Sequence, residues 1–180
     1  MSVKYDLYVD GSAIGNINVD ANTPTGWSMV CVNKNNESMV NEIYGRVATD
    51  PNLEHYIGAE IGSNNTAEIT ALYEALLFIE QGHHLGIDAE SYTIYGDSMY
   101  AGKMAMGEWN PKQNKKLVKS LVKKWNSLKR LGISFSWEHI KAHSGHLWNE
   151  RADYLARETA KGNNPSSLND WRANAARSVK

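Results

Sequence analysis

Apolar and polar residues alternate along the beginning of the chain, from Val3 to Val9. A period of two residues is typical of a β-strand, and we expect this strand to end at Asp10. Two further strand-like stretches, Trp27–Val32 and Met39–Val47, flank a short segment rich in asparagine that has the composition of a hairpin turn. Three strands in a row predict an antiparallel meander.

The apolar spacing changes to three and four residues between Ala67 and Ile79, which predicts an α-helix that ends at Gly82. Short strands and helices then alternate: the expected strands are Tyr92–Asp97 and Ile133–His139, and the expected helices are Ser98–Met106, Lys112–Arg130 and Trp148–Lys161. Strands that alternate with helices are joined by parallel crossovers. The pattern therefore predicts an α/β fold, with a five-stranded mixed sheet of three antiparallel strands and then parallel strands, flanked by helices.

The length of 180 residues suits one domain with a substantial core, which we expect to span residues 1–162. Residues 163–180 are polar. They are expected to form an extension that is either a frayed, flexible tail or a short extra helix around Trp171. Residues 48–62 show no regular pattern.

Composition narrows the choice of function. The net charge of −1 gives no overall basic character, so binding to nucleic acid would have to depend on local charge. Cys31 is the only cysteine and excludes an intramolecular disulfide. No stretch approaches the roughly 20 apolar residues that span a bilayer, and no apolar run follows the N-terminus as in a signal peptide. We therefore expect a cytoplasmic protein with no membrane association.

Four acidic residues stand where a sheet edge can gather them. Asp10 and Asp97 each end a predicted strand, and parallel neighbouring strands end at the same edge. Glu68 lies on the apolar stripe of the first helix, although its spacing from Asn65 also fits a capping box. Asp153, near the start of the last helix, either faces the same edge or is a solvated acid favoured by the helix N-terminus.

Four acids at one edge would repel one another strongly unless divalent cations neutralised them. Oxygen ligands without cysteine suit Mg²⁺ or Mn²⁺ better than Zn²⁺. His143 and His146 are three residues apart in a glycine-containing loop, but no further ligands stand at zinc spacing. A loop histidine that titrates near neutral pH is better suited to carrying a proton.

The segment from Lys103 to Arg130 contains nine basic residues and one acid, Glu108. Such a segment is either an ordinary solvated helix face or a contact surface for phosphates. Because the charges are almost all of one sign, we favour phosphate contact, with Lys115 and Lys119 among the binding residues.

Several motifs, taken together and in this order, resemble type 1 ribonuclease H over roughly residues 3–160; they are Asp10-Gly11-Ser12 with Gly15-Asn16, Asn64-Asn65-Thr66-Ala67-Glu68, Gly96-Asp97-Ser98-Met99-Tyr100 and the run His143-Ser144-Gly145-His146-Leu147-Trp148-Asn149-Glu150-Arg151-Ala152-Asp153. The resemblance implies the RNase H fold and endonucleolytic, two-metal cleavage of the RNA strand of RNA·DNA hybrids, leaving 5′-phosphate and 3′-hydroxyl ends.

The resemblance also implies roles for individual residues. Asp10 would bridge two Mg²⁺ ions (Mn²⁺ is the alternative), Glu68 and Asp97 would complete one metal site, and Asp153 the other. His143 would assist proton transfer or product release. The substrate contacts implied are with the hybrid at Asn16, Asn64 and Asn65, and with a DNA-strand phosphate at Ser63 and Asn114. We expect a monomer without an obligate protein partner.

Some features depart from the family pattern. Met99 replaces a polar residue that contacts the hybrid in many members, and the loops at 17–25 and 48–62 are longer than usual. Two alternatives remain open. A 3′–5′ exonuclease of related fold commonly carries Asp-x-Glu where this chain has Asp10-Gly11-Ser12. A non-catalytic hybrid-binding module would have lost a carboxylate, and none is lost here.

Overall fold

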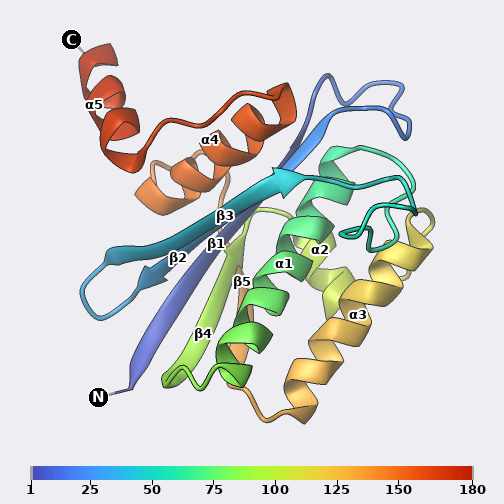
Figure 1. Cartoon of the computed structure of the whole chain (residues 1–180), viewed down its shortest axis with the longest axis horizontal. Coiled ribbons are helices and arrows are strands. Elements are labelled where there is room, and N and C mark those ends of the chain that lie inside the picture. The colour runs from blue at the N-terminus through green and yellow to red at the C-terminus, as the bar shows by residue number, and fades with distance from the viewer. Residues whose placement is uncertain (1, 180) are drawn as a thin grey trace.

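The structure, a computed structural model, describes residues 2–179 and is built on one mixed sheet (Figure 1). Its strands are β1 (Val3–Ala13), β2 (Thr25–Asn33), β3 (Ser38–Arg46), β4 (Ala89–Gly96) and β5 (Phe135–His139). The order across the sheet is β3-β2-β1-β4-β5. Strand β2 runs antiparallel to both β1 and β3, whereas β4 runs parallel to both β1 and β5. The predicted five-stranded mixed sheet is confirmed.

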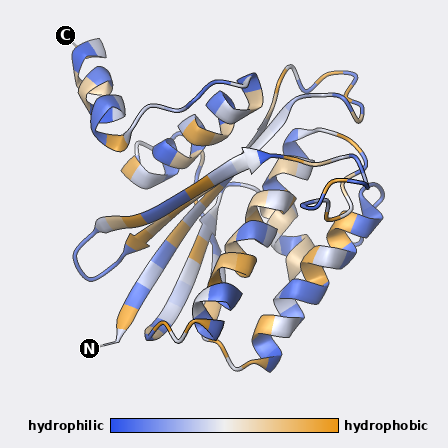
Figure 2. Cartoon of the chain, in the orientation of Figure 1, coloured by the Kyte–Doolittle hydropathy of each residue, from blue (hydrophilic) through white to orange (hydrophobic). Residues whose placement is uncertain are grey.

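Helices cover both faces of this sheet: α1 (Asn64–His84), α2 (Met99–Ala105) and α3 (Lys115–Arg130) lie on one side and α4 (Leu147–Lys161) on the other, followed by α5 (Leu168–Ser178) (Figure 1). The alternation along β1 explains the two layers. Leu7 and Val9 belong to the larger core with α1 and α3, whereas Tyr8 packs in a smaller core with Trp148 and Leu155 of α4. Along helix α3, bands of hydrophobic residues recur between hydrophilic ones (Figure 2), and the buried Leu117, Leu121 and Leu128 have the spacing of an amphipathic helix.

Several element boundaries differ from the prediction. β1 continues past Asp10 to Ala13, because β2 pairs with it along this whole length. β5 begins at Phe135 rather than Ile133. Helix α3 begins at Lys115 rather than Lys112, since Asn114 adopts a left-handed backbone conformation with φ of 55°.

The start of α1 also corrects an expectation. Ser63 caps the helix by accepting a hydrogen bond from the backbone N–H of Thr66, so neither Asn64 nor Asn65 is the cap. The capping-box interpretation of Glu68 is therefore wrong, because Glu68 does not stand three residues after the true cap. Its carboxylate is available for another role.

The two long loops pack together beside the start of α1. The backbone N–H of Gly62 donates to the carbonyl of Asp20 at 2.8 Å, and Thr49 Oγ1 donates to the carbonyl of Ala21 at 2.6 Å. The second loop also contacts α3, where Ser120 Oγ donates to the carbonyl of Ile57 at 2.8 Å. The segment without a sequence pattern is thus held by contacts with distant residues.

Of the two alternatives for residues 163–180, the structure contains the helix, α5. Its Trp171 ring lies 5.9 Å from the ring of Tyr154, and the guanidinium of Arg151 lies 5.4 Å from both rings. Arg151 is buried and also pairs with Glu42 of β3 at 2.7 Å, so this corner joins α4, α5 and the edge strand. Within residues 2–179, no helix combines the length and the apolar character needed to cross a bilayer.

Candidate active site

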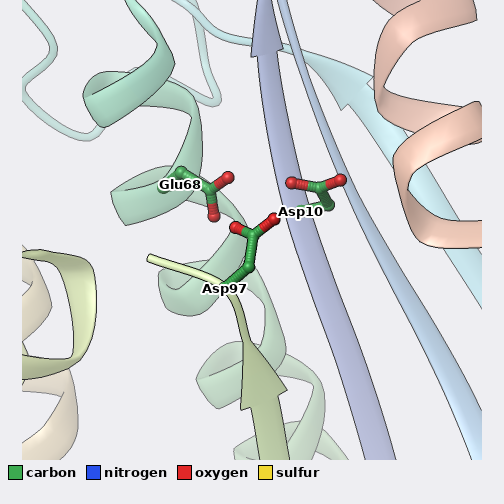
Figure 3. Close-up of side chains that lie close together, drawn as sticks. All are labelled: Asp10, Glu68 and Asp97. Atoms are coloured by element: carbon green, nitrogen blue, oxygen red, sulfur yellow. The ribbon is translucent and has the colours of Figure 1, made fainter. Parts of the chain in front are cut away.

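Three carboxylates from different elements meet at one edge of the sheet. Asp10 lies in β1, Glu68 in α1, and Asp97 directly after β4. One oxygen of each side chain lies within 4.8 Å of the other two, and Figure 3 shows the three side chains close together. Tyr8 pairs with Tyr95 across the parallel strands, so Asp10 and Asp97, each two residues further on, come side by side. The predicted gathering of these three acids is what the fold produces.

Glycine at position 11 lets α1 approach β1 closely enough to form this cluster. A Cβ at Gly11 would lie 2.5 Å from the backbone of Ala67 and from the backbone nitrogen of Glu68. The N–H of Gly11 points into the cluster, where it donates to Asp10 Oδ1 at 2.8 Å and to Glu68 Oε1 at 3.2 Å. Both carboxylates are thereby oriented by one backbone group.

The cluster is electrostatically costly without a cation. Burial raises the pKa of Asp10 from 3.8 to about 7, and the charges of Asp97 and Asp153 add to the rise. Burial, followed by the charge of Asp10, raises the pKa of Glu68 well above its usual value, and burial also raises that of Asp97. A divalent cation would offset both the burial and the repulsion. The donors are all carboxylate oxygens, which fits Mg²⁺ or Mn²⁺.

Asp153, the fourth predicted ligand, lies nearby without joining the three-carboxylate group. It stands on α4, and its charge raises the pKa of both Asp10 and Asp97. Its Oδ2 is 2.8 Å from Nη2 of Arg157, one helical turn further along. This ion pair occupies the carboxylate in the structure, and metal binding by Asp153 stays a prediction.

The two histidines of the segment between β5 and α4, His143 and His146, differ in their surroundings. His143 is exposed and has a left-handed backbone with φ of 51°, and a positive charge on its ring would lower the pKa of Asp97, against the larger effect of burial. His146 stands at the N-cap position of α4, with its ring stacked 4.9 Å from that of Tyr8. The metal-ligand group found within residues 2–179 includes neither histidine.

A third histidine at this edge was not anticipated. His139 ends β5, and its Nε2 lies 3.1 Å from the backbone carbonyl oxygen of Asp97. The alternating pattern identified His139 only as a strand residue. The available signal was its place at the carboxyl end of a strand parallel to the one that carries Asp97.

Two of the three predicted hybrid-binding asparagines, Asn16 and Asn64, connect the end of β1 and the loop after it to the start of α1. Asn16 Oδ1 accepts from the backbone N–H of Asn64 at 3.0 Å, and Asn64 Oδ1 accepts from that of Ala13 at 2.8 Å. Asn16 adopts a left-handed conformation, with φ of 38°, and Asn65 is exposed on the first turn of α1. The loop after β1 is therefore fixed to the start of the helix that carries Glu68.

The two predicted phosphate-binding residues belong to one hydrogen-bonded group. Ser63 Oγ bonds Thr66 Oγ1 at 2.8 Å, and Asn114 Nδ2 donates to the same Thr66 oxygen at 3.0 Å. Asn114 Oδ1 accepts from the N–H of Glu60 at 3.2 Å, and the Asn114 side chain is buried. The group joins the starts of α1 and α3, and phosphate contact there stays a prediction.

Not all of the basic residues between Lys103 and Arg130 are available to a ligand. Lys103 pairs with Glu108, Lys124 pairs with Glu80, and Lys129 lies over the ring of Phe135. The exposed basic residues that remain include Lys112, Lys115, Lys116, Lys119, Lys123 and Arg130. Four of these, Lys115, Lys116, Lys119 and Lys123, lie at three- or four-residue spacing on α3 and form its lysine face. The buried Leu117, Leu121 and Leu128 lie on the opposite side of the helix. This lysine face is smaller than the sequence count suggests.

A buried all-carboxylate cluster at the edge of this mixed sheet, together with a lysine face, has the chemistry that a metal-dependent nuclease requires. The particular family follows from comparison. The family model described as RNase H matches residues 3–161, and the chain belongs to that family. It is therefore a ribonuclease H, a nuclease of the hydrolase class.

Individual relatives agree. The ribonuclease H of Ehrlichia canis is 29% identical over 86% of this chain and 92% of its own length, and that of Hahella chejuensis is 32% identical over 84% and 89%. Among solved structures, RNase H1 of Halobacterium salinarum has a TM-score of 0.60 at 25% identity, covering 88% of this chain and 98% of the other. LC11-RNase H1, solved in complex with an RNA/DNA hybrid, has a TM-score of 0.59 at 18% identity, covering 88% and 97%.

Proposed function

We propose that this ribonuclease H cleaves the RNA strand of RNA·DNA hybrids by two-metal-ion hydrolysis, leaving 5′-phosphate and 3′-hydroxyl ends. The observation that carries the proposal is the buried Asp10–Glu68–Asp97 cluster in an RNase H fold. The hybrid bound in the related LC11-RNase H1 structure supports the substrate class. A catalytic domain of residues 1–162 acting as a monomer in the cytoplasm completes the proposal.

The carboxylates provide the metal-binding chemistry. Asp10, Glu68 and Asp97 would hold the first Mg²⁺, with Asp153 and Asp10 at the second. When bound, the two ions supply an activated water and stabilise the charge of the leaving 3′ oxygen. The Gly11 N–H keeps Asp10 and Glu68 in place, and Arg157 restrains Asp153. His143, exposed in its loop, would carry a proton at an imidazole nitrogen or assist product release.

Substrate selection is proposed to combine two surfaces. The lysine face of α3 would follow the phosphate backbone of the DNA strand. Ser63 and Asn114, the expected contacts for a DNA-strand phosphate, both bond Thr66 Oγ1 beside the start of α3. Asn16, Asn64 and Asn65, beside the cluster, carry both donors and acceptors and are suited to the ribose 2′-hydroxyl that distinguishes RNA from DNA. A hybrid would thereby be read on both of its strands.

The test is cleavage of end-labelled duplexes in the presence of Mg²⁺. We expect cutting of RNA·DNA within the RNA strand, also when its 3′ end is blocked, and none of RNA·RNA or single-stranded RNA. Excess EDTA and the Asp97→Asn variant serve as negative controls. Equal rates on RNA·RNA and RNA·DNA, or cutting that survives EDTA, would contradict the proposal, and a requirement for a free 3′ end would indicate an exonuclease.

A further inference from the structure

The imidazole at the end of β5 reaches across to the neighbouring strand. His139 pairs with Gly96 in the parallel ladder, and its Nε2 lies 3.1 Å from the carbonyl oxygen of Asp97. A carbonyl oxygen can only accept, so Nε2 carries the proton and donates it. This hydrogen bond joins β5 to the backbone of the residue that bears one of the three cluster carboxylates.

Asp97 has little else to fix its backbone. The last ladder bond of this strand pair runs from the N–H of Ile140 to the carbonyl of Gly96 at 2.9 Å. Helix α2 begins only at Met99, after Ser98 has capped it by accepting from the N–H of Ala101 at 3.2 Å. Asp97 therefore lies in the short connection between the end of β4 and the start of α2, and the hydrogen bond from His139 holds the backbone of this connection.

We propose that His139 is a positioning residue for the metal site. Its Nε2–H bond fixes the Asp97 peptide and so determines the direction in which the Asp97 carboxylate faces Asp10 and Glu68. The inference rests on the proposed metal-dependent cleavage and adds a residue to it. Contacts that orient a metal ligand from behind typically change metal affinity by roughly 10- to 100-fold.

The side chain of His139 contributes little to the core. It is exposed, and its ring lies 6.4 Å from that of Trp137 at a tilt of 53°. Its role also differs from that of His143, which lies in the loop and is proposed to carry a proton. Substitution of His139 is therefore expected to leave the fold intact and to affect the geometry of the carboxylate.

The experiment compares two substitutions. His139→Gln keeps an N–H donor at a similar distance from the backbone, whereas His139→Leu removes it. His83→Leu is the matched control, because His83 is an exposed histidine in the last turn of α1, far along the helix from Glu68. Mn²⁺ binding to each substrate-free protein is measured by titration calorimetry, and kcat and KM on an RNA·DNA hybrid are measured at saturating Mg²⁺.

We expect His139→Leu to weaken Mn²⁺ binding by about 10-fold or more and to lower kcat, with KM for the hybrid unchanged. His139→Gln should restore affinity to within about three-fold of the wild type, and His83→Leu should match the wild type. Wild-type affinity in His139→Leu, or equal losses in the Leu and Gln variants, would overturn the proposal. The calorimetry remains informative even if the wild type fails to cut a hybrid, so this result is separate from that of the proposed function.

Discussion

Replacing Asp10 with asparagine should stabilise the metal-free protein while abolishing cleavage. Asparagine has nearly the same shape, and its Oδ1 can still accept from the N–H of Gly11, which lies 2.8 Å from Oδ1 of Asp10. The substitution removes a negative charge from a buried site that Glu68 and Asp97 share. Burial and repulsion are therefore relieved without creating a cavity.

The size of this effect follows from the pKa of Asp10, which burial raises from 3.8 to about 7. One pKa unit corresponds to about 1.4 kcal/mol, so ionising Asp10 in the folded state destabilises it by up to roughly 4 kcal/mol. The folded state holds the proton more tightly than the unfolded state. Below pH 3.8 both states are protonated and nothing is lost; stability then falls with rising pH and levels off above about pH 7.

The assay is urea unfolding in EDTA at pH 5 and pH 8, for the wild type, Asp10→Asn and the control Asp88→Asn, which changes an exposed acid. The gain in unfolding free energy from Asp10→Asn should be larger at pH 8 than at pH 5, and Asp88→Asn should stay within about 0.5 kcal/mol of the wild type. Adding Mg²⁺ should stabilise the wild type more than Asp10→Asn, because only the wild type retains the full ligand set.

The reasoning would be refuted by an Asp10→Asn variant that is less stable than the wild type in EDTA at pH 8. A gain independent of pH would likewise mean that the charge of Asp10 is not the source of the effect. Retained cleavage by a correctly folded Asp10→Asn protein would remove this residue from the metal site.

Three further predictions follow from the same geometry. Asp97→Asn should abolish hybrid cleavage and His143→Ala should slow it without eliminating it, measured as kcat; a His143→Ala enzyme as inactive as Asp97→Asn would contradict the assisting role. The double variant Lys115→Ala with Lys119→Ala should raise KM and leave kcat nearly unchanged. The slope of log KM against log salt concentration should fall by up to about two, and equal slopes in the variant and the wild type would mean that the hybrid binds elsewhere. Gly11→Ala should destabilise the protein by about 1–3 kcal/mol in urea unfolding, because its Cβ would lie 2.5 Å from Ala67, and unchanged stability would refute the close approach of α1.

Much of the secondary structure of this protein can be predicted from the spacing of its apolar residues. The spacing of two residues in β1 and of three or four in α1 reflects local backbone geometry, which the side chains of each segment reveal on their own. The order of strands and helices then implies that Asp10 and Asp97 reach the same edge, since neighbouring parallel strands end together. These features needed no knowledge of contacts between distant segments.

Other features depended on how the elements cross. The sequence left two roles open for Glu68, a capping box or a place in the acidic cluster. The fold places it in the cluster, because Ser63 is the helix cap and Gly11 lets α1 pack closely against β1. His139 meets the carbonyl of Asp97 only because β5 lies beside β4.

The lysine face shows the same division. The sequence shows how many charged residues lie between Lys103 and Arg130. Only the structure shows that Lys124 pairs with Glu80 of α1 and that Lys129 lies over the ring of Phe135 in β5. Periodicity reports which face a side chain occupies along its own element. Only packing between elements determines which groups it meets there, because the distances involved are set by residues far apart in the chain.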